Sequence, residues 1–155
     1  MSLAILESEN ENIAFRIAAY IAGREGYAPG VNIASASAPA EIPGVKPDLV
    51  VVSPGASLPA SPRTKIRCGT LLLPDGAPSV GFEPDRVVSY GMSPRDTVTL
   101  SSIGESSCML SLQREVPTLG GGILDRQEFI VRRDGGPGET LATSGALLIL
   151  GLQPE

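Results

Sequence analysis

Residues 47–55 carry the clearest hydrophobic pattern of the chain. The run Leu-Val-Val-Val at 49–52 is apolar throughout, and Ser53-Pro54-Gly55 ends it abruptly. A short β-branched run without a polar face is typical of a strand that is buried on both sides, and such strands belong to parallel sheets covered on both faces. We therefore expect 49–52 to be an interior strand of a parallel sheet.

The chain before this run has the pattern of a strand followed by a helix. Residues 3–6 are apolar, and apolar residues then recur at helical spacing over 13–22. Ser8 and Glu11 have the Ser-x-x-Glu spacing of a capping box, in which two side chains satisfy backbone N–H groups at a helix start. We expect a helix over about 9–24 that ends at a glycine.

Further strands are expected on both sides of the central run. Residues 31–35, 69–74 and 86–91 read as strands, with loop at 57–62 and a helical turn at 63–68. Strands that alternate with connectors in this way are typical of a parallel sheet with Rossmann-like topology.

The pattern changes after residue 92. Residues 97–101 and 108–113 alternate strictly between apolar and polar side chains, with a turn at 104–107, which predicts a β-hairpin. Segments 116–119, 123–124 and 128–132 extend this antiparallel part. Residues 137–150 favour a last helix, although the apolar run 146–150 is also compatible with a strand.

The fold class that follows is α/β. A small, mostly parallel Rossmann-like sheet is expected first, then antiparallel hairpins and a C-terminal helix. We expect a single domain over 1–155, with a Rossmann-like half at 1–92 and an antiparallel β-rich half at 93–155. Apolar residues make up 42% of the chain and charged residues 19%, which is globular composition.

Charge and composition exclude several classes of function. The net charge is −5, aromatic residues are 4% of the chain, and no basic stripe occurs, so nucleic-acid binding is not expected. No apolar run approaches the roughly 18 residues of a membrane span. The chain has no His, which removes His-assisted triads and imidazole metal sites.

The two cysteines indicate a compartment. Cys68 and Cys108 lie far apart without Cys-x-x-Cys spacing, and no signal peptide is evident. We expect a cytoplasmic protein whose two thiols are buried small hydrophobes, with a disulfide between them as the alternative.

The carboxyl ends of the strands are where a ligand is expected, because ligands of open α/β sheets gather at this rim. The helix start has no glycine and three carboxylates, which repel phosphate and favour a cationic or hydroxyl-rich ligand. Dinucleotide binding is therefore not expected. The residues that the topology brings to the rim are Glu7, Ser8, Ser53, Gly55, Asp75, Tyr90 and Gly91.

Other candidate chemistry has a simpler structural interpretation. Gly120-Gly121-Gly122 could form an anion nest, but a hairpin turn is the better interpretation because no Lys follows. Cys108 and the nearby serines have no His to activate them. Four carboxylates could bind Mg²⁺ or simply keep the surface soluble: Glu105, Glu115, Asp125 and Glu128. Four arginines are also close in the sequence: Arg114, Arg126, Arg132 and Arg133. For these arginines we expect cross-strand pairs with Glu115 and Glu128.

Two segments resemble pieces of a known enzyme family. PDLVVVSPG at 47–55 resembles the strand and "SPG" turn in the N-terminal region of Mur ligases, which add amino acids to cell-wall precursors. VVSYGMSPRD at 87–96 is similar to the "YG…D" strand and turn late in their central domain, where antiparallel strands follow. The family's Gly-Lys-Thr phosphate loop, its magnesium-binding Glu and its His have no counterpart here. The resemblance therefore implies a fold, and neither an ATP site nor a catalytic residue.

Three functional hypotheses follow. The first is a non-catalytic cytosolic module that binds a small polar ligand or a partner, without cofactor or metal. The second is an enzyme that acts on a small polar metabolite through carboxylates with Mg²⁺. The third is a structural domain that forms a homodimer through its edge strands.

Overall fold

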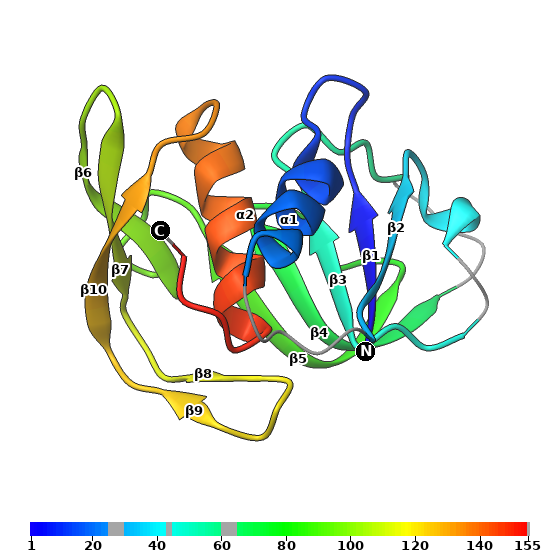
Figure 1. Cartoon of the computed structure of the whole chain (residues 1–155). Helices are drawn as coiled ribbons and strands as arrows, with labels where there is room; N and C mark the ends of the chain where they lie inside the picture. Colours follow the sequence, from blue (N-terminus) through cyan, green and yellow to red (C-terminus); the bar gives the residue numbers. More distant parts are fainter. Residues whose placement is uncertain (25–29, 43–44, 60–64, 155) are drawn as a thin grey trace.

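A computed structural model describes residues 1–24, 30–42, 45–59 and 65–154. Within these residues the chain forms an eight-stranded sheet in the order β10-β7-β6-β5-β4-β3-β1-β2 (Figure 1). The strands are β1 (Ser2–Leu6), β2 (Asn32–Ala36), β3 (Leu49–Val52), β4 (Ile66–Pro74), β5 (Phe82–Tyr90), β6 (Val98–Ile103), β7 (Ser107–Leu112) and β10 (Gln127–Arg132).

The expected fold class is confirmed. Strands β2, β1, β3, β4, β5 and β6 run parallel, although β5 and β6 pair only at Tyr90 and Val98. Strand β7 returns antiparallel to β6, and β10 runs antiparallel to β7, so the hairpin predicted after residue 97 extends the parallel sheet.

Strand β3 is an interior strand, as its sequence predicts. It pairs in parallel with β1 on one side and β4 on the other. Each of its four residues is at most 1% exposed. Leu49 and Val51 belong to the apolar cluster on one face of the sheet, and Val50 and Val52 belong to the cluster on the other.

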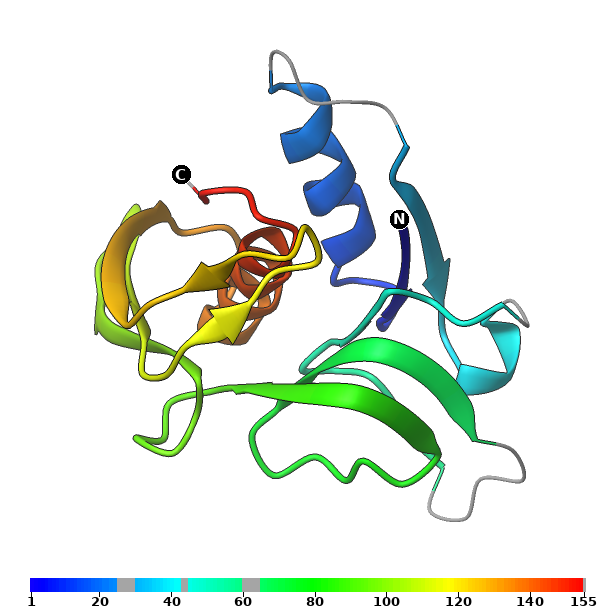
Figure 2. The ribbon, with the colours of Figure 1, turned by 90° about the horizontal axis from the view of Figure 1, so that it is seen from below.

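Both helices lie on the same face of the sheet (Figure 1). They are α1 (Ile13–Ala22) and α2 (Pro137–Ile149), which confirms the C-terminal helix. The sheet curves so that β6, β7 and β10 wrap round α2 (Figure 2). Residues 140–150 are consequently all buried, and none of them is charged, although Thr140, Thr143 and Ser144 are polar.

Around β1, β3 and β4, the opposite face of the sheet is covered by irregular connections. A 3₁₀ turn at Pro39–Glu41 follows β2, and Ile42, Ala56, Leu58 and Ala77 pack from connecting segments onto the second apolar cluster. Helices normally cover this face in doubly wound sheets. Here short Pro-rich connections do so, and their turns shape the rim where the strands end.

Several predicted boundaries were wrong, and β5, for example, begins at Phe82 and not at residue 86. Helix α1 begins at Ile13 and not near residue 9, because Asn12 has a left-handed backbone conformation, φ 55°, which a right-handed helix cannot include. The helical turn expected over 63–68 is strand from Ile66 onward, and residues 63–64 lie outside the described residues.

The triglycine forms a turn, as its simpler interpretation predicts. It joins β8 (Val116–Pro117) to β9 (Ile123–Leu124), which form a separate two-stranded antiparallel sheet. Gly121 has φ 94°, a conformation that favours glycine. The N–H of Thr118 donates to the carbonyl of Gly122 at 2.8 Å and closes the turn.

A Gly69→Ala substitution should destabilise the sheet. A Cβ at this position of β4 would lie 2.6 Å from the carbonyl oxygen of Asp48, a backbone atom of the strand entry beside it. We expect the free energy of unfolding to fall by about 1–3 kcal/mol, the usual cost of overpacking. Urea unfolding measures it.

Gly120→Ala is the matched control. A Cβ there meets nothing within 4 Å, and the expected change is within about 0.5 kcal/mol. Equal effects of the two substitutions would contradict the close approach of β4 to Asp48.

Candidate functional site

The carboxyl ends of β1, β3, β4 and β5 meet at one rim of the sheet. Three of the predicted site residues, Ser8, Ser53 and Gly55, surround the carboxylate of Glu11 there. Two others, Asp75 and Gly91, adjoin each other at the ends of β4 and β5. Glu7 and Tyr90 also lie at this rim, where Glu7 bonds the start of α1 and Tyr90 is enclosed in the core.

Glu11 joins the loop after β1 to the loop after β3. Its Oε1 accepts hydrogen bonds from the backbone N–H of Ser8 at 2.8 Å, from Ser8 Oγ at 2.9 Å and from Ser53 Oγ. Its Oε2 accepts the N–H of Gly55 at 2.9 Å. The residue is 6% exposed, so these bonds are largely shielded from water.

These hydrogen bonds keep the Glu11 side chain ionised. Burial alone raises the pKa of Glu11, but the bonds from Ser53, Ser8 and Gly55 outweigh burial and hold the pKa below its ordinary value of 4.5. A charged carboxylate therefore sits among donors that converge from two strands.

The position of this carboxylate bears on which ligands the rim can take. Strand order reverses between β1 and β3, and this switch point is where open α/β sheets commonly bind nucleotides and other anions. In this chain two backbone N–H groups and two hydroxyls at the switch point already bind an anion, the carboxylate of Glu11. A phosphate group would have to displace it.

Glu7 stabilises the start of α1. Its Oε2 accepts the backbone N–H of Ala14 at 2.9 Å, in the first turn of the helix, and its Oε1 accepts Ser35 Oγ at 3.3 Å. A carboxylate at this end also complements the helix dipole. Glu7 thus ties β1, α1 and β2 together.

Tyr90 is a core residue at the rim. It is 1% exposed, and its hydroxyl donates to the carbonyl of Val52 at 2.6 Å. Burial raises the pKa of Tyr90, and the negative charge of Glu11 adds to the effect. Tyr90 is therefore enclosed, and it bonds the residue that precedes the Ser53-Pro54-Gly55 turn.

Asp75, Gly91 and Asp96 lie together at the ends of β4 and β5. A Cβ on Gly91 would lie 2.7 Å from Asp75 Cβ and 2.6 Å from Asp96 Oδ2, so only glycine leaves room here. Asp96 is 1% exposed and accepts the N–H of Ser93 at 3.0 Å, whereas Asp75 is exposed.

A cavity of about 380 Å³ opens at the rim between the loops after β3 and β4. It is polar in part, and Asp75 is the one charged residue among the described residues that line it. The lining residues are Val52, Ser53, Pro54, Ala56, Leu58, Pro74, Asp75, Gly76, Ala77 and Pro78.

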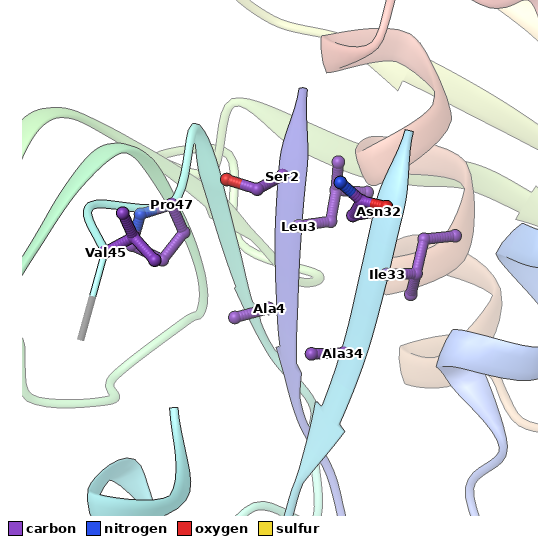
Figure 3. Close-up of a pocket in the computed structure, with 8 residues that line it drawn as sticks. All are labelled: Ser2, Leu3, Ala4, Asn32, Ile33, Ala34, Val45 and Pro47. Carbon is purple, nitrogen blue, oxygen red and sulfur yellow. The ribbon is translucent and has the colours of Figure 1, made fainter. Parts of the chain in front are cut away.

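A smaller, mostly apolar cavity of about 230 Å³ lies at the other end of the strands. Figure 3 shows Ser2, Ala4 and Ala34 on the side of β1 and β2 that faces Val45 and Pro47. Small side chains on the two strands leave this hollow. It offers van der Waals contact but no charged group.

The two cysteines lie apart in the core. Cys68 and Cys108 are free and buried, in clusters on opposite faces of the sheet. Burial, with a smaller contribution from Asp85, raises the pKa of Cys68 to about 11, so its thiol stays protonated at neutral pH. Among the described residues, no three Cys, Asp or Glu side chains are grouped to hold a metal ion.

Two residues of the rim were missed from the sequence. The sequence predicts Glu11 as half of a capping box, and its bond to the N–H of Ser8 is present, but nothing local signals its bonds to the loop after β3. Asp96 appeared only as the last residue of the Mur-like segment.

Neither described helix is long and apolar enough to cross a membrane.

Comparison with known proteins gave no match, whether to protein-family models, to curated proteins or to solved structures. The resemblance to Mur ligases therefore stays a prediction from residues 47–55 and 87–96.

Glu11→Gln should destabilise the protein at neutral pH. The amide group would face the N–H donors of Ser8 or Gly55 with a donor of its own, at a cost of about 2 kcal/mol. Because the folded pKa lies below 4.5, the ionised carboxylate stabilises the fold above that pH, and this contribution is lost as the pH falls through the folded pKa. The difference in the free energy of unfolding between the wild type and Glu11→Gln should therefore narrow in acid.

Urea unfolding between neutral and acidic pH measures this gap. Glu9→Gln, an exposed carboxylate of the same loop, is the control and should change stability little. A gap for Glu11→Gln that is independent of pH would mean that the carboxylate is not held in its charged form.

Proposed function

We propose that the chain is a non-catalytic binding module that holds a small cationic or hydroxyl-rich molecule in the rim cavity. The observation that carries this proposal is the exposed carboxylate of Asp75 beside an open cavity of about 380 Å³. Ligand sites of α/β sheets are concentrated at this rim.

The charge at the rim supports a cation over a phosphate. Carboxylates of Glu7, Glu11, Asp75 and Asp96 gather at the ends of the strands. Their combined potential attracts cations and repels anions. The donors that an anion needs at the switch point are bonded to Glu11.

The hydroxyls of the rim support binding over group transfer. Ser8 Oγ and Ser53 Oγ both donate to Glu11 Oε1, and Ser53 is 1% exposed. A carboxylate could act as a base toward such a hydroxyl, but the low pKa of Glu11 makes it a weak one.

The two free thiols support placing the module in a reducing compartment such as the cytoplasm.

Ligand screening by two-dimensional NMR tests the proposal. Putrescine, ethanolamine, amino acids and simple sugars represent the favoured classes, and ATP and inorganic phosphate represent the disfavoured one. We expect a favoured compound to shift the amide signals of residues 53–58 and 74–78, and Asp75→Asn to weaken its binding about tenfold or more through loss of a charge-assisted bond.

Asp125→Asn removes an exposed carboxylate from a region that does not line the cavity and should leave binding unchanged. Binding of ATP or phosphate at the rim, or a ligand response that Asp75→Asn leaves intact, would overturn the proposal.

A further inference from the structure

Strand β10 ends the sheet, because within the described residues it pairs with β7 alone. The direction of its backbone groups follows from the ladder with β7. The N–H of Arg133 donates to the carbonyl of the directly opposite Ser106 at 3.0 Å. Because residues of an antiparallel ladder alternate, Glu128, Ile130 and Arg132 turn their N–H and C=O groups toward the free edge.

The same three residues carry their side chains on the outer face of the sheet. Val131 between them is 1% exposed and packs in the core around α2, whereas Ile130 is 69% exposed. Glu128 and Arg132 are also exposed. The expected pairing of Glu128 with an arginine within the chain is wrong: the ion pairs of the described residues involve Arg16 and Lys46.

We propose that two copies of the chain associate through β10, antiparallel and with Ile130 opposite the partner's Ile130. In this register Glu128 faces the partner's Arg132, and Arg132 faces the partner's Glu128. The two-fold axis therefore gives one cross-strand ion pair on each side of the apolar Ile130 pair. The sheet continues across the interface, and the edge groups of β10 find partners.

The direction of the backbone groups restricts the register. A shift of the register by one residue would set the edge-facing residues of one copy against residues of the partner's β10 whose backbone groups already bond β7. A shift by two would set Ile130 against a charged side chain and leave one charge of each strand unmatched. The centred register alone pairs every edge-facing residue with a complementary one, and β10 contains no Pro or Lys to block pairing.

The outer face beside β10 continues the apolar contact. Ile130 is opposite Met109 in the ladder, and both line a hollow of about 270 Å³ together with Ile103. Pairing would place Met109, Ile130, and their two counterparts in one row across four strands. The other edge strand, β2, has the sequence Asn-Ile-Ala-Ser-Ala and no charge to set a register.

Charge reversal tests this register in the full chain. Sedimentation from micromolar to near-millimolar concentration should show a monomer–dimer equilibrium, because one strand edge buries less area than a standard interface. Glu128→Arg and Arg132→Glu should each raise the dimer dissociation constant about tenfold or more, since each replaces two attractive pairs by two repulsive ones. The double variant Glu128→Arg/Arg132→Glu should restore it.

Val87→Lys, on β5 and 51% exposed, adds a charge away from the edge and should leave the equilibrium unchanged. Circular dichroism of each variant verifies the fold. A wild-type chain that stays monomeric at all concentrations would overturn the proposal. So would single variants that dimerise normally, or a folded double variant that does not recover.

Discussion

The carboxylate of Glu11 holds together the rim at the carboxyl ends of the strands. It connects the two loops that flank the switch point of the sheet, and four hydrogen bonds from Ser8, Ser53 and Gly55 converge on it. The Ser53-Pro54-Gly55 turn is thereby fixed above Tyr90, whose hydroxyl bonds the last residue of β3. Helix α2 starts against the same turn, since a Cβ on Gly138 would lie 2.7 Å from Pro54.

This arrangement moves the accessible part of the rim. An open switch point between β1 and β3 favours anionic ligands, because backbone N–H groups and helix starts converge there. In this chain those donors hold an internal anion. The cavity that remains open lies one strand further along, between the ends of β3 and β4, and its charged lining residue is the acidic Asp75. The proposed preference for cations or polyols follows from that shift.

The sequence predicted the parts of the fold that depend on local pattern. The apolar run of β3, the alternation of β6 and β7 and the strand at β10 each identified their elements, because burial of one or two faces imposes a period on the residues. The start of α1 was predicted too early because Asn12 has a left-handed backbone conformation, which the helical spacing of apolar residues does not reveal. Nor does any local pattern reveal the bonds of Glu11 to Ser53 and Gly55. The rim residues could be predicted from topology, but the enclosure of Tyr90 and the close approach of Asp75, Gly91 and Asp96 depend on tertiary packing.

The central claim is that Glu11 is a buried, charged carboxylate held by convergent donors. A ¹³C NMR titration of its side-chain carboxyl in the folded protein tests this claim most directly. We predict a midpoint below 4.5, because the hydrogen bonds outweigh burial. A midpoint at or above 4.5, as burial alone would produce, would contradict it.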